Sequence, residues 1–385
     1  MKLAYITTYD STRLTGSDEW SGTGYYIAEA LKSQSIELDY GGALKDRTLI
    51  KAIRKIKRHY YQRVHRKNYE KNSDPLTLKS FARQIKQKLD LNHNDVVFSA
   101  TVEPIAYLEC DRPIAFWADA TFAGIADCYP QYSNLHADVI RDWHKMEQMA
   151  LERSQLAIYS SDWAAKSAIE FYHADPNKVK VVPFGANINH EFDFEEIKRA
   201  IVARPKDVCK LLFIGVEWYR KGGDVAYAVA KQLNESGLTT ELTIVGCQPL
   251  IDKPLPEYVK SLGFISKSTP EGKARLNQLI MESHFLILPS LADCTPMVFP
   301  EANSLGVPCL SNRVGGIPSV IKEDENGRLF ASDRNVSEYC NYIEDLFANY
   351  DRYQKLAYSS FDAYKSRLNW QVAGARVKNL LAEII

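Results

Sequence analysis

The stretch from Phe285 to Ile321 reads FLILPSLADCTPMVFPEANSLGVPCLSNRVGGIPSVI, and it decides the fold. It opens with FLILPS, an apolar run with the length and character of a buried strand. A loop that carries Asp293 follows, and then a helix that contains Glu301. Pro300 must fall in the first turn of this helix, where its missing N–H costs little. A strand that leads through a loop into a helix is the repeating unit of a doubly wound parallel sheet.

The same strand–loop–helix unit recurs along the whole chain. Short apolar, β-branched runs alternate with longer segments of helical periodicity. Runs that are apolar on both faces and separated by helices are typical of parallel sheets in an α/β protein. The strands predicted in the first half are Leu3–Thr7, Ile36–Tyr40, Val96–Ala100, Ile114–Trp117, Leu156–Ser160 and Val179–Pro183. Those predicted in the second half are Leu211–Gly215, Leu242–Gly246, Leu262–Ile265, Phe285–Pro289, Pro308–Ser311 and Arg328–Phe330.

The series of strands restarts near residue 210, so the sequence predicts two domains, for which 385 residues are sufficient. Residues 185–207 are polar and charged and contain Pro205, which indicates a linker. We therefore predict an α/β protein with two Rossmann-like domains, residues 1–190 and 206–366, that face each other across a cleft. Ligands of such sheets bind at the carboxyl ends of the strands.

The composition excludes several classes of protein. Lys and Arg together number 48, as do Asp and Glu, so no nucleic-acid binding through global charge is expected. The seven cysteines include no Cys-x-x-Cys pair, which indicates reduced thiols rather than disulfides or a zinc site. The first predicted strand starts at Leu3 with no signal peptide before it, and no apolar run approaches the roughly 18–20 residues that span a bilayer. We expect a cytoplasmic protein.

One stretch departs from the alternation of strands and helices. Residues 45–71 hold eleven Lys or Arg residues against two acids. The apolar residues recur at steps of four, three, four and four, which is one stripe of a helix: Leu49, Ile53, Ile56, Tyr60 and Val64. Such a helix either packs on the first sheet with a solvated basic face or lies on an anionic membrane surface. The second alternative would associate the protein with the inner surface of a membrane.

The stretch 285–321 resembles the donor domain of the family 4 (group 1) retaining glycosyltransferases, which have the GT-B fold. Asp293 precedes Glu301 by eight positions, as the first acid precedes the second in that family's Glu-x7-Glu element. The segment EANSLGVPCLSNRVGGIPSVI is similar to the family's Glu-Ala, Gly-x-Pro and Gly-Gly-x-Pro elements. The sequence departs from the family at Asp293, which replaces a Glu, and at residues 294–296, which replace a Phe-Gly. The altered loop leaves the transferred sugar undetermined.

The resemblance implies that a nucleotide-sugar donor binds in this second domain. Asp293 would meet hydroxyls of the transferred sugar and Glu301 the ribose, because carboxylates accept hydrogen bonds from hydroxyl groups. Thr295 and the backbone N–H groups of Met297 and Val298 would meet the diphosphate at the start of the helix.

A second stretch, LLFIGVEWYRKGGD at residues 211–224, again leads from a strand into a helix. It resembles the family segment in which Gly-Arg is followed five residues later by Lys-Gly, with Gly215 and Lys221 at the matching spacing. Val216 stands where the family has Arg, and Arg220 is placed to replace that charge. The resemblance implies that Lys221 and Arg220 contact the diphosphate, on which negative charge builds as the glycosidic bond breaks. Solvated surface positions are the alternative.

Weaker resemblances mark further contacts. Ile265 stands where the family's base-binding loop lies. Gly22 and Gly24 are similar to the small-residue loop after the first strand, although they also suit a simple turn and do not complete a GxGxxG motif. Asp119 would contact the acceptor or the sugar, unless it caps a helix. A C-terminal helix at residues 367–385 resembles the family's last helix, which crosses back to complete the acceptor-binding first domain.

The predicted activity is transfer of a sugar from a nucleotide-diphosphate sugar to a hydroxyl acceptor, in glycan, polysaccharide or glycolipid biosynthesis. A UDP-sugar is expected from its frequency in the family, and the acceptor would be a sugar, a glycan or a lipid-linked molecule. The family retains the anomeric configuration, which implies front-face transfer with a donor phosphate oxygen helping to deprotonate the acceptor. The sequence has no Asp-x-Asp motif, so neither a metal nor another cofactor is expected. Two alternatives stay open: another reaction on the GT-B fold, and a non-catalytic protein that binds sugar nucleotides.

Overall fold

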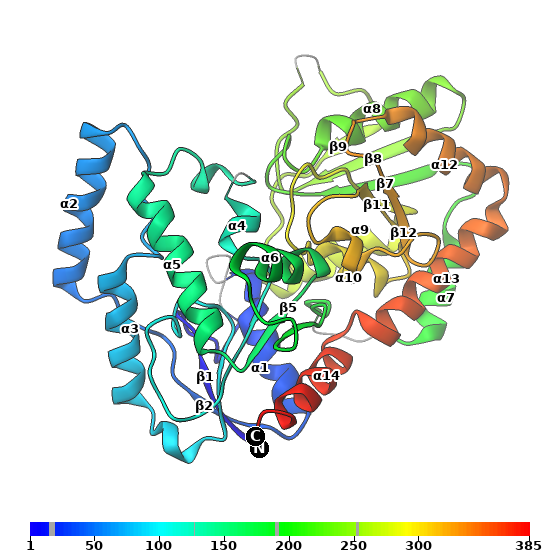
Figure 1. The fold of residues 1–385 in the computed structure, drawn as a ribbon. Coiled ribbons are helices and arrows are strands. Elements are labelled where there is room, and N and C mark those ends of the chain that lie inside the picture. Colours follow the sequence, from blue (N-terminus) through cyan, green and yellow to red (C-terminus); the bar gives the residue numbers. More distant parts are fainter. Residues whose placement is uncertain (15–19, 127, 189–191, 252–253) are drawn as a thin grey trace. The chain divides into compact units, whose positions relative to one another are not determined.

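The computed structural model describes residues 1–14, 20–126, 128–188, 192–251 and 254–385. The chain forms two compact units, shown in Figure 1: a first unit of Met1–Pro183 with Trp370–Ile385, and a second unit of Phe184–Asn369. Each unit holds one six-stranded parallel sheet, which confirms the predicted α/β class with two Rossmann-like sheets. The predicted domain limit at residue 190 lies outside the described residues. No helix in the described ranges combines the length and the apolar character that crossing a membrane requires.

The sheet of the first unit has the strand order β2-β1-β3-β4-β5-β6. In its register Tyr5 lies opposite both Tyr40 and Phe98. The central strands are buried along their whole length, as expected for a parallel sheet covered on both faces. The strands are β1 Lys2–Ile6, β2 Glu37–Tyr40, β3 Val96–Ser99, β4 Ile114–Ala118, β5 Leu156–Tyr159 and β6 Val179–Val181.

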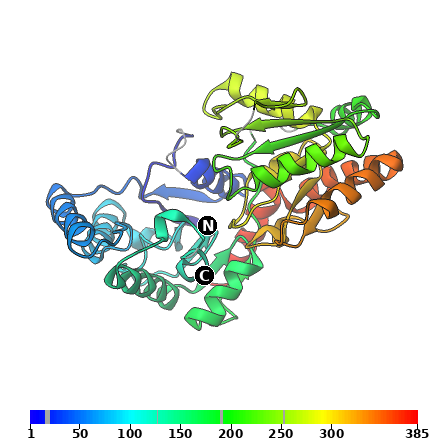
Figure 2. The same ribbon diagram turned by 90° about the horizontal axis from the view of Figure 1, so that it is seen from above.

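Seven α-helices belong to the first unit within its described residues. Figures 1 and 2 both show α2 beside α3 at the margin of this unit. The helices are α1 Thr23–Ser33, α2 Thr48–Val64, α3 Pro75–Lys88, α4 Phe122–Ile125, α5 Ala137–Arg153, α6 Asp162–Tyr172 and α14 Trp370–Ala382.

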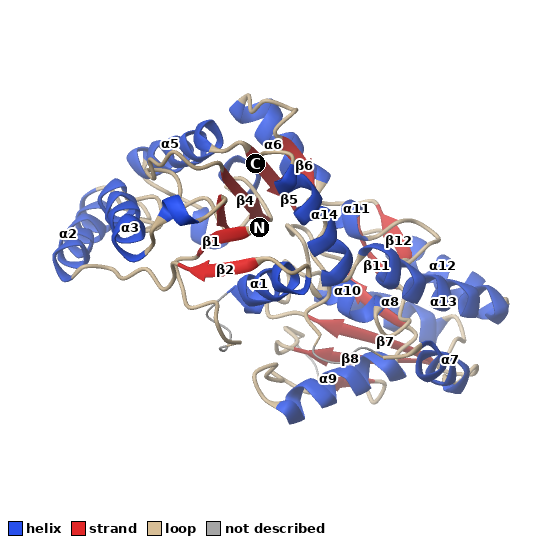
Figure 3. Cartoon of the chain, turned by 90° about the horizontal axis from the view of Figure 1, so that it is seen from below, coloured by secondary structure: helices blue, strands red, loops and turns tan. Residues whose placement is uncertain are grey.

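Successive residues of the first sheet point to opposite helical layers, as the pleat requires. On one face the Tyr5 hydroxyl donates to the Gly24 carbonyl of α1 (2.6 Å), and Trp370 of α14 lies edge-on to Trp117 (5.7 Å between ring centres). The alternate strand residues pack with buried side chains of α3 and α5. Figure 3 shows α1 and α14 on one side of the sheet and α3 and α5 on the other. The C-terminal helix therefore covers a face that would otherwise lack half of its layer.

The second sheet has the strand order β12-β11-β10-β7-β8-β9. The prediction of a strand at Leu262–Ile265 is wrong, because the edge strand β9, Val259–Ser261, ends just before it. Gly263 has a φ of +65°, in the left-handed region, which a strand does not permit, and Phe264 is 66% exposed. The strands are β7 Cys209–Ile214, β8 Thr240–Val245, β9 Val259–Ser261, β10 Phe285–Leu288, β11 Cys309–Asn312 and β12 Gly327–Phe330.

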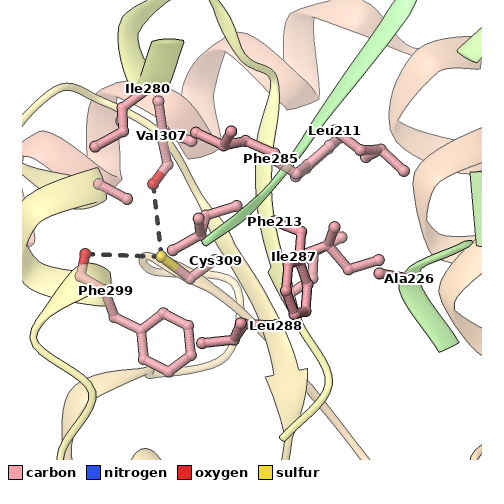
Figure 4. Packing of buried hydrophobic residues seen from close by; sticks show 14 of the residues in the cluster. Leu211, Phe213, Ala226, Ile280, Phe285, Ile287, Leu288, Phe299, Val307 and Cys309 are labelled. Atoms are coloured by element: carbon pink, nitrogen blue, oxygen red, sulfur yellow. Dashed lines mark hydrogen bonds between the residues drawn. The ribbon is translucent and has the colours of Figure 1, made fainter. Parts of the chain in front are cut away.

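The core of the second unit fixes α10 against the sheet. In Figure 4, Phe299 of α10 lies beside Leu288 of β10, and the single S–H of Cys309 has two carbonyl acceptors within reach, those of Phe299 (3.7 Å) and Val307 (3.8 Å). The helices of this unit are α7 Phe194–Ala203, α8 Gly223–Glu235, α9 Pro270–Glu282, α10 Val298–Asn303, α11 Ile317–Val320, α12 Val336–Ala348 and α13 Tyr350–Arg367.

The segment interpreted as a linker, residues 185–207, contains a packed helix. Asp193 and Glu196 form a reciprocal capping box at the start of α7, and Ile197 and Ile201 are buried against the second unit. The high content of charged residues in this segment reflects the exposed face of α7 rather than an open connection.

Candidate active site

The loop between β7 and α8 folds against the end of β10. Gly222 precedes α8 with a φ of +75°, and a Cβ atom on it would overlap the carbonyl oxygen of Pro289. Only glycine permits this close approach of the two loops. Because β7 and β10 are neighbours in the sheet, the approach brings Arg220 and Lys221 next to the loop that follows β10.

Lys221 and Arg220 meet carboxylates at this position. Lys221 forms an ion pair with Asp293, and the two side chains are only 14% and 9% exposed. Arg220 lies near the same carboxylate, with Nη1 3.9 Å from Oδ2 of Asp293. Arg220 also donates to both carboxylate oxygens of Glu217 (2.7 and 2.9 Å), and these hydrogen bonds lower the pKa of Glu217. An anion that enters the site must compete with carboxylates of the chain itself for both cations.

The backbone of Asp293 is held by the Gly-Gly-x-Pro element. Gly315 has a φ of +53°, and a Cβ atom on it would overlap the carbonyl oxygen of Asp293. The N–H of Gly316 donates to that same carbonyl (3.2 Å). Gly315 is therefore required by the close approach of the two loops, and the contacts of both glycines with the carbonyl of Asp293 fix the position of its backbone.

Glu301 is a buried carboxylate with one free oxygen. It lies on α10 and is 5% exposed. Oε2 accepts from the ammonium group of Lys267 (2.5 Å), whereas Oε1 is buried and has no hydrogen-bond partner among the described residues. A buried acceptor without a donor costs about 1–3 kcal/mol, and more when it is charged. A ligand hydroxyl that donates to Oε1 would remove this cost.

The start of α10 agrees closely with its expected position. The helix begins at Val298 with Met297 as the N-cap residue, and Pro300 lies in the first turn. Thr295 is buried in the preceding loop. These residues therefore occupy the loop-to-helix turn between Asp293 and Glu301, at the carboxyl end of β10.

Ile265 lies in the loop that follows β9, and it is half-buried. The carbonyl of Gly263 in the same loop accepts from the N–H of Gly246 at the end of β8 (2.8 Å). The loop continues to Lys267, which reaches Glu301. The loops after β7, β9 and β10 thus lie at one edge of the second sheet, because all of its strands are parallel.

The predicted residues of the first unit lie at the carboxyl ends of β1 and β4. Gly22 precedes α1 with a φ of +81°, and Gly24 is buried under the Tyr5 hydroxyl. Asp119 follows β4 and accepts from the indole N–H of Trp20 (3.3 Å). The side chain that caps α4 is that of Thr121, so Asp119 is not the capping residue.

The structure therefore brings Lys221, Arg220 and Asp293 into contact, and it places Glu301 on the helix that follows them. Sequence reasoning missed Glu217 and Lys267. The spacing of Glu217 and Arg220, three residues apart next to a helix start, was a usable signal. Lys267 lies in a polar loop, SKSTP, whose sequence carries no signal that it contacts Glu301.

Sequence reasoning also missed two acids of the first unit, the buried Glu147 and the half-buried Glu103. Glu147 of α5 is 1% exposed, and its Oε2 has no hydrogen-bond partner among the described residues. Burial, followed by the nearby carboxylate of Glu103, raises the pKa of Glu147 to about 8. Burial also raises the pKa of Glu103. Glu147 is therefore largely protonated at neutral pH.

Metal coordination has no candidate site in the part of the chain that the structure describes. No group of three or more His, Cys, Asp or Glu side chains there is arranged to hold an ion. Arg220, Lys221 and Lys267 place positive charge at this edge of the second sheet.

The two sheets, with the final helix returned to the first unit, define the GT-B fold. Sucrose-phosphate synthase from Thermosynechococcus elongatus superposes with a TM-score of 0.71 at 14% identity, over 99% of this chain and 98% of that chain. HepE of Anabaena, in complex with UDP and glucose, superposes with a TM-score of 0.63 at 14% identity, over 99% of each chain. At this level of identity the likeness establishes the fold alone.

A family model matches most of the second unit. Residues 194–362, which include Lys221, Asp293 and Glu301, match the model of the family described as glycosyl transferases group 1.

Two bacterial relatives illustrate the similarity in sequence. D-inositol 3-phosphate glycosyltransferase of Rhodococcus erythropolis is 25% identical over 222 residues, which are 55% of this chain and 50% of that protein. The enzyme of the same name from Streptomyces bingchenggensis is 24% identical over 253 residues, which are 62% of this chain and 54% of that protein. The matched part of the chain thus spans about half the length of these relatives.

Proposed function

We propose that this protein is a retaining glycosyltransferase that moves a sugar from a nucleotide-diphosphate sugar to a hydroxyl acceptor. One observation carries the proposal: Glu301 is buried with an oxygen that has no partner among the described residues, on the helix that follows the Lys221–Asp293 pair, inside the region that matches the group 1 glycosyl transferase model. A buried acceptor and a cation at one edge of a parallel sheet suit a ligand that has hydroxyls and phosphates.

Each contact of the proposed donor follows from the chemistry of these residues. The ribose hydroxyls would donate to Glu301, and the hydroxyls of the transferred sugar would donate to Asp293. Lys221 and Arg220 would hold the diphosphate, with Thr295 and the start of α10 beside it. Lys221 then exchanges the carboxylate of Asp293 for phosphate oxygens, which frees Asp293 to accept from the sugar.

The cations would act on the reaction as well as on binding. Negative charge grows on the diphosphate as the glycosidic bond breaks, so a fixed cation stabilises the transition state more than the ground state. Retention of configuration requires the acceptor to arrive on the face that the diphosphate leaves, and a phosphate oxygen would take the acceptor proton. These cations would do the work that a metal does in other transferases, so we propose a metal-independent reaction without a further cofactor.

The remaining assignments concern the substrates. HepE of Anabaena has been solved with UDP-glucose, which supports a UDP-sugar donor for a chain of the same fold. Ile265 would lie near the base, whereas Gly22, Gly24 and Asp119 would serve the acceptor in the first unit. The acceptor would be a sugar, a glycan or a lipid-linked molecule, used to build a glycan, polysaccharide or glycolipid. A lipid-linked acceptor would bring this cytoplasmic protein to the inner surface of a membrane, through residues 45–71.

Thermal unfolding of the whole chain with UDP, GDP, ADP and their sugars tests the donor site, because a ligand that binds only the folded state raises the midpoint. We expect one nucleotide series to raise it, with and without EDTA. Nucleotide release should then depend on an added acceptor. Release of a sugar phosphate instead would indicate phosphorolysis, and binding without any turnover would indicate a non-catalytic protein. Glu301→Gln should lose the shift, whereas Glu241→Gln, an exposed acid of the same sheet, should keep it.

A further inference from the structure

Two basic side chains of helix α2 turn towards the rest of the first unit. Arg54 is 8% exposed and forms an ion pair with Asp46 (2.5 Å). Lys57 forms an ion pair with the buried carboxylate of Asp74 at the start of α3 (2.5 Å). The Tyr61 hydroxyl donates to a carboxylate of α5 (3.3 Å). Charged and polar contacts therefore attach α2 to its neighbours.

The apolar stripe of α2 faces solvent. Leu49 is 73% exposed, Ile56 70%, Val64 62% and Tyr60 50%, and only Ile53 of this stripe is half-buried. A helix at the surface of a globular protein usually turns such a stripe to the core. The reversed orientation leaves a continuous apolar strip on the outside, and a strip of this kind marks a surface that binds something.

The charge around the stripe limits what can bind. Residues 45–71 carry eleven Lys or Arg residues against two acids, in a chain whose total charge is balanced. Lys51, Lys55 and Arg58 are exposed, and within the described part of the chain none of them is ion-paired. They lie on the side of the helix opposite the stripe, but a helix is only about 10–12 Å across, close to one Debye length at physiological salt. All of these charges would act on a surface that the stripe touches.

We infer that α2 is a membrane-docking helix that binds anionic phospholipid. The helix would lie parallel to the bilayer with Leu49, Ile56 and Val64 in the acyl boundary and Tyr60 at the level of the headgroups. A second copy of the chain fits this surface poorly, because two such basic segments would repel each other.

This inference deepens the proposal of a lipid-linked acceptor, but its test does not depend on sugar transfer. The full chain is sedimented with vesicles of phosphatidylcholine alone, or of phosphatidylcholine and phosphatidylglycerol in equal parts. We expect binding to the anionic vesicles that weakens with added salt, and little binding to the neutral ones. If the wild-type chain turned over the donor but did not bind anionic vesicles, the inference would be contradicted and the proposed function would be unaffected.

Substitutions separate the stripe from the charges. The double variant Leu49→Glu, Ile56→Glu changes two exposed side chains and should reduce vesicle binding at least tenfold with an unchanged unfolding midpoint. The control is Val202→Glu, which places one of the two added charges at a 58% exposed apolar position of α7 in the second unit and should bind like the wild type. Lys51→Gln, Lys55→Gln and Arg58→Gln should each reduce binding about fivefold.

Three outcomes would overturn the inference. The wild type could fail to bind anionic vesicles, or the double variant could bind them as well as the wild type does. In the third outcome, the wild type is a dimer in analytical ultracentrifugation, and the double variant is a monomer with unchanged vesicle binding. That result would assign the stripe to contact between protein copies.

Discussion

The Lys221–Asp293 ion pair has two roles at the scale of single residues. In the structure each group neutralises the other, whereas a bound diphosphate would take over the cation. In the absence of a ligand, the carboxylate of Asp293 therefore holds Lys221 in place of the diphosphate. This explains how two nearly buried charges can remain in a site that must open to an anion, since a buried charge without a partner is strongly unfavourable.

Lys221→Gln should lower donor turnover at least tenfold, because a lost charge-assisted contact is worth roughly 1.5–3 kcal/mol. The loss should appear in kcat as well as in kcat/KM, since the charge on the leaving group is largest in the transition state. Steady-state kinetics with saturating donor measure both constants. An unchanged kcat in this variant would remove Lys221 from the reaction.

Lys267→Gln tests the residue that sequence reasoning missed. Glu301 would then lose its counter-charge while the ribose hydroxyls kept their acceptor, so we expect KM for the donor to rise severalfold with a smaller change in kcat. Lys260→Gln is the matched control, because Lys260 forms an exposed ion pair with Glu241 in the neighbouring strand. Equal kinetic constants for the two variants would show that Lys267 does not contribute to donor binding.

The sequence predicted the residues whose spacing is tied to backbone geometry. Asp293, Glu301 and Lys221 stand at fixed distances from glycines and prolines that the loops require, so their pattern survives in the linear chain. Lys267 has no such anchor. Its contact with Glu301 depends on where the loop after β9 lies, and only the folded sheet determines that.

At the scale of elements, close approaches between loops determine where the side chains of the site lie. Gly315→Ala should lower both stability and donor turnover, because the new methyl group would overlap the carbonyl of Asp293 and move its side chain. Gly237→Ala is the control, since Gly237 also has a positive φ (+100°), but no atom lies within 4 Å of the position that its new methyl group would take. Gly237→Ala should lose only the stability that a residue with a Cβ atom loses at a positive φ, about 1–2 kcal/mol.

Chemical denaturation and steady-state kinetics measure the two effects. If Gly315→Ala and Gly237→Ala lose equal stability and keep equal turnover, the Gly-Gly-x-Pro element does not position Asp293.

Element boundaries show where sequence patterns reach their limit. Eleven predicted strands overlap observed ones, because short apolar runs between helical segments have few alternatives. The twelfth was placed too late, since the apolar letters of Leu262 and Phe264 suggested a strand that the positive φ of Gly263 forbids. For α7, the buried side chains of Ile197 and Ile201 decided the structure, and a local reading of charge could not reveal them.

The stability of the whole molecule should respond to pH in opposite ways in the two units. In the first unit the native pKa of Glu147, about 8, is above its unfolded value of about 4.3. The native state then holds a proton that the unfolded state has released, so the stability of this unit should fall as pH rises from about 4.3 to 8.

In the second unit the effect has the other sign. Burial, followed by the charge of Arg204, lowers the pKa of His284 to about 3, and its Nδ1 accepts from the N–H of Lys210 (3.0 Å). The unfolded histidine takes up a proton near pH 6.5, so the stability of this unit should fall as pH drops from there towards 3.

Hydrogen exchange at several pH values can follow the two units separately. Glu147→Gln should weaken the pH response of the first unit between pH 5 and 8 and leave that of the second unit unchanged; a smaller response of the same sign should remain, because burial also raises the pKa of Glu103. An undiminished decline of the stability of the first unit with rising pH in this variant would show that Glu147 is not responsible.

The return of the chain to its first unit has a consequence for biosynthesis. Trp370 stacks on Tyr26 (6.3 Å between ring centres) and meets Trp117, so α14 supplies part of the cover for one sheet face. The N–H of Ala186 donates to the carbonyl of Leu368 (2.9 Å), which ties the entry of the second unit to its exit. A ribosome therefore releases the whole second unit before the first can be completed. Until α14 is synthesised, the aromatic face around Trp117 would remain exposed, which would make it a binding site for a chaperone during translation.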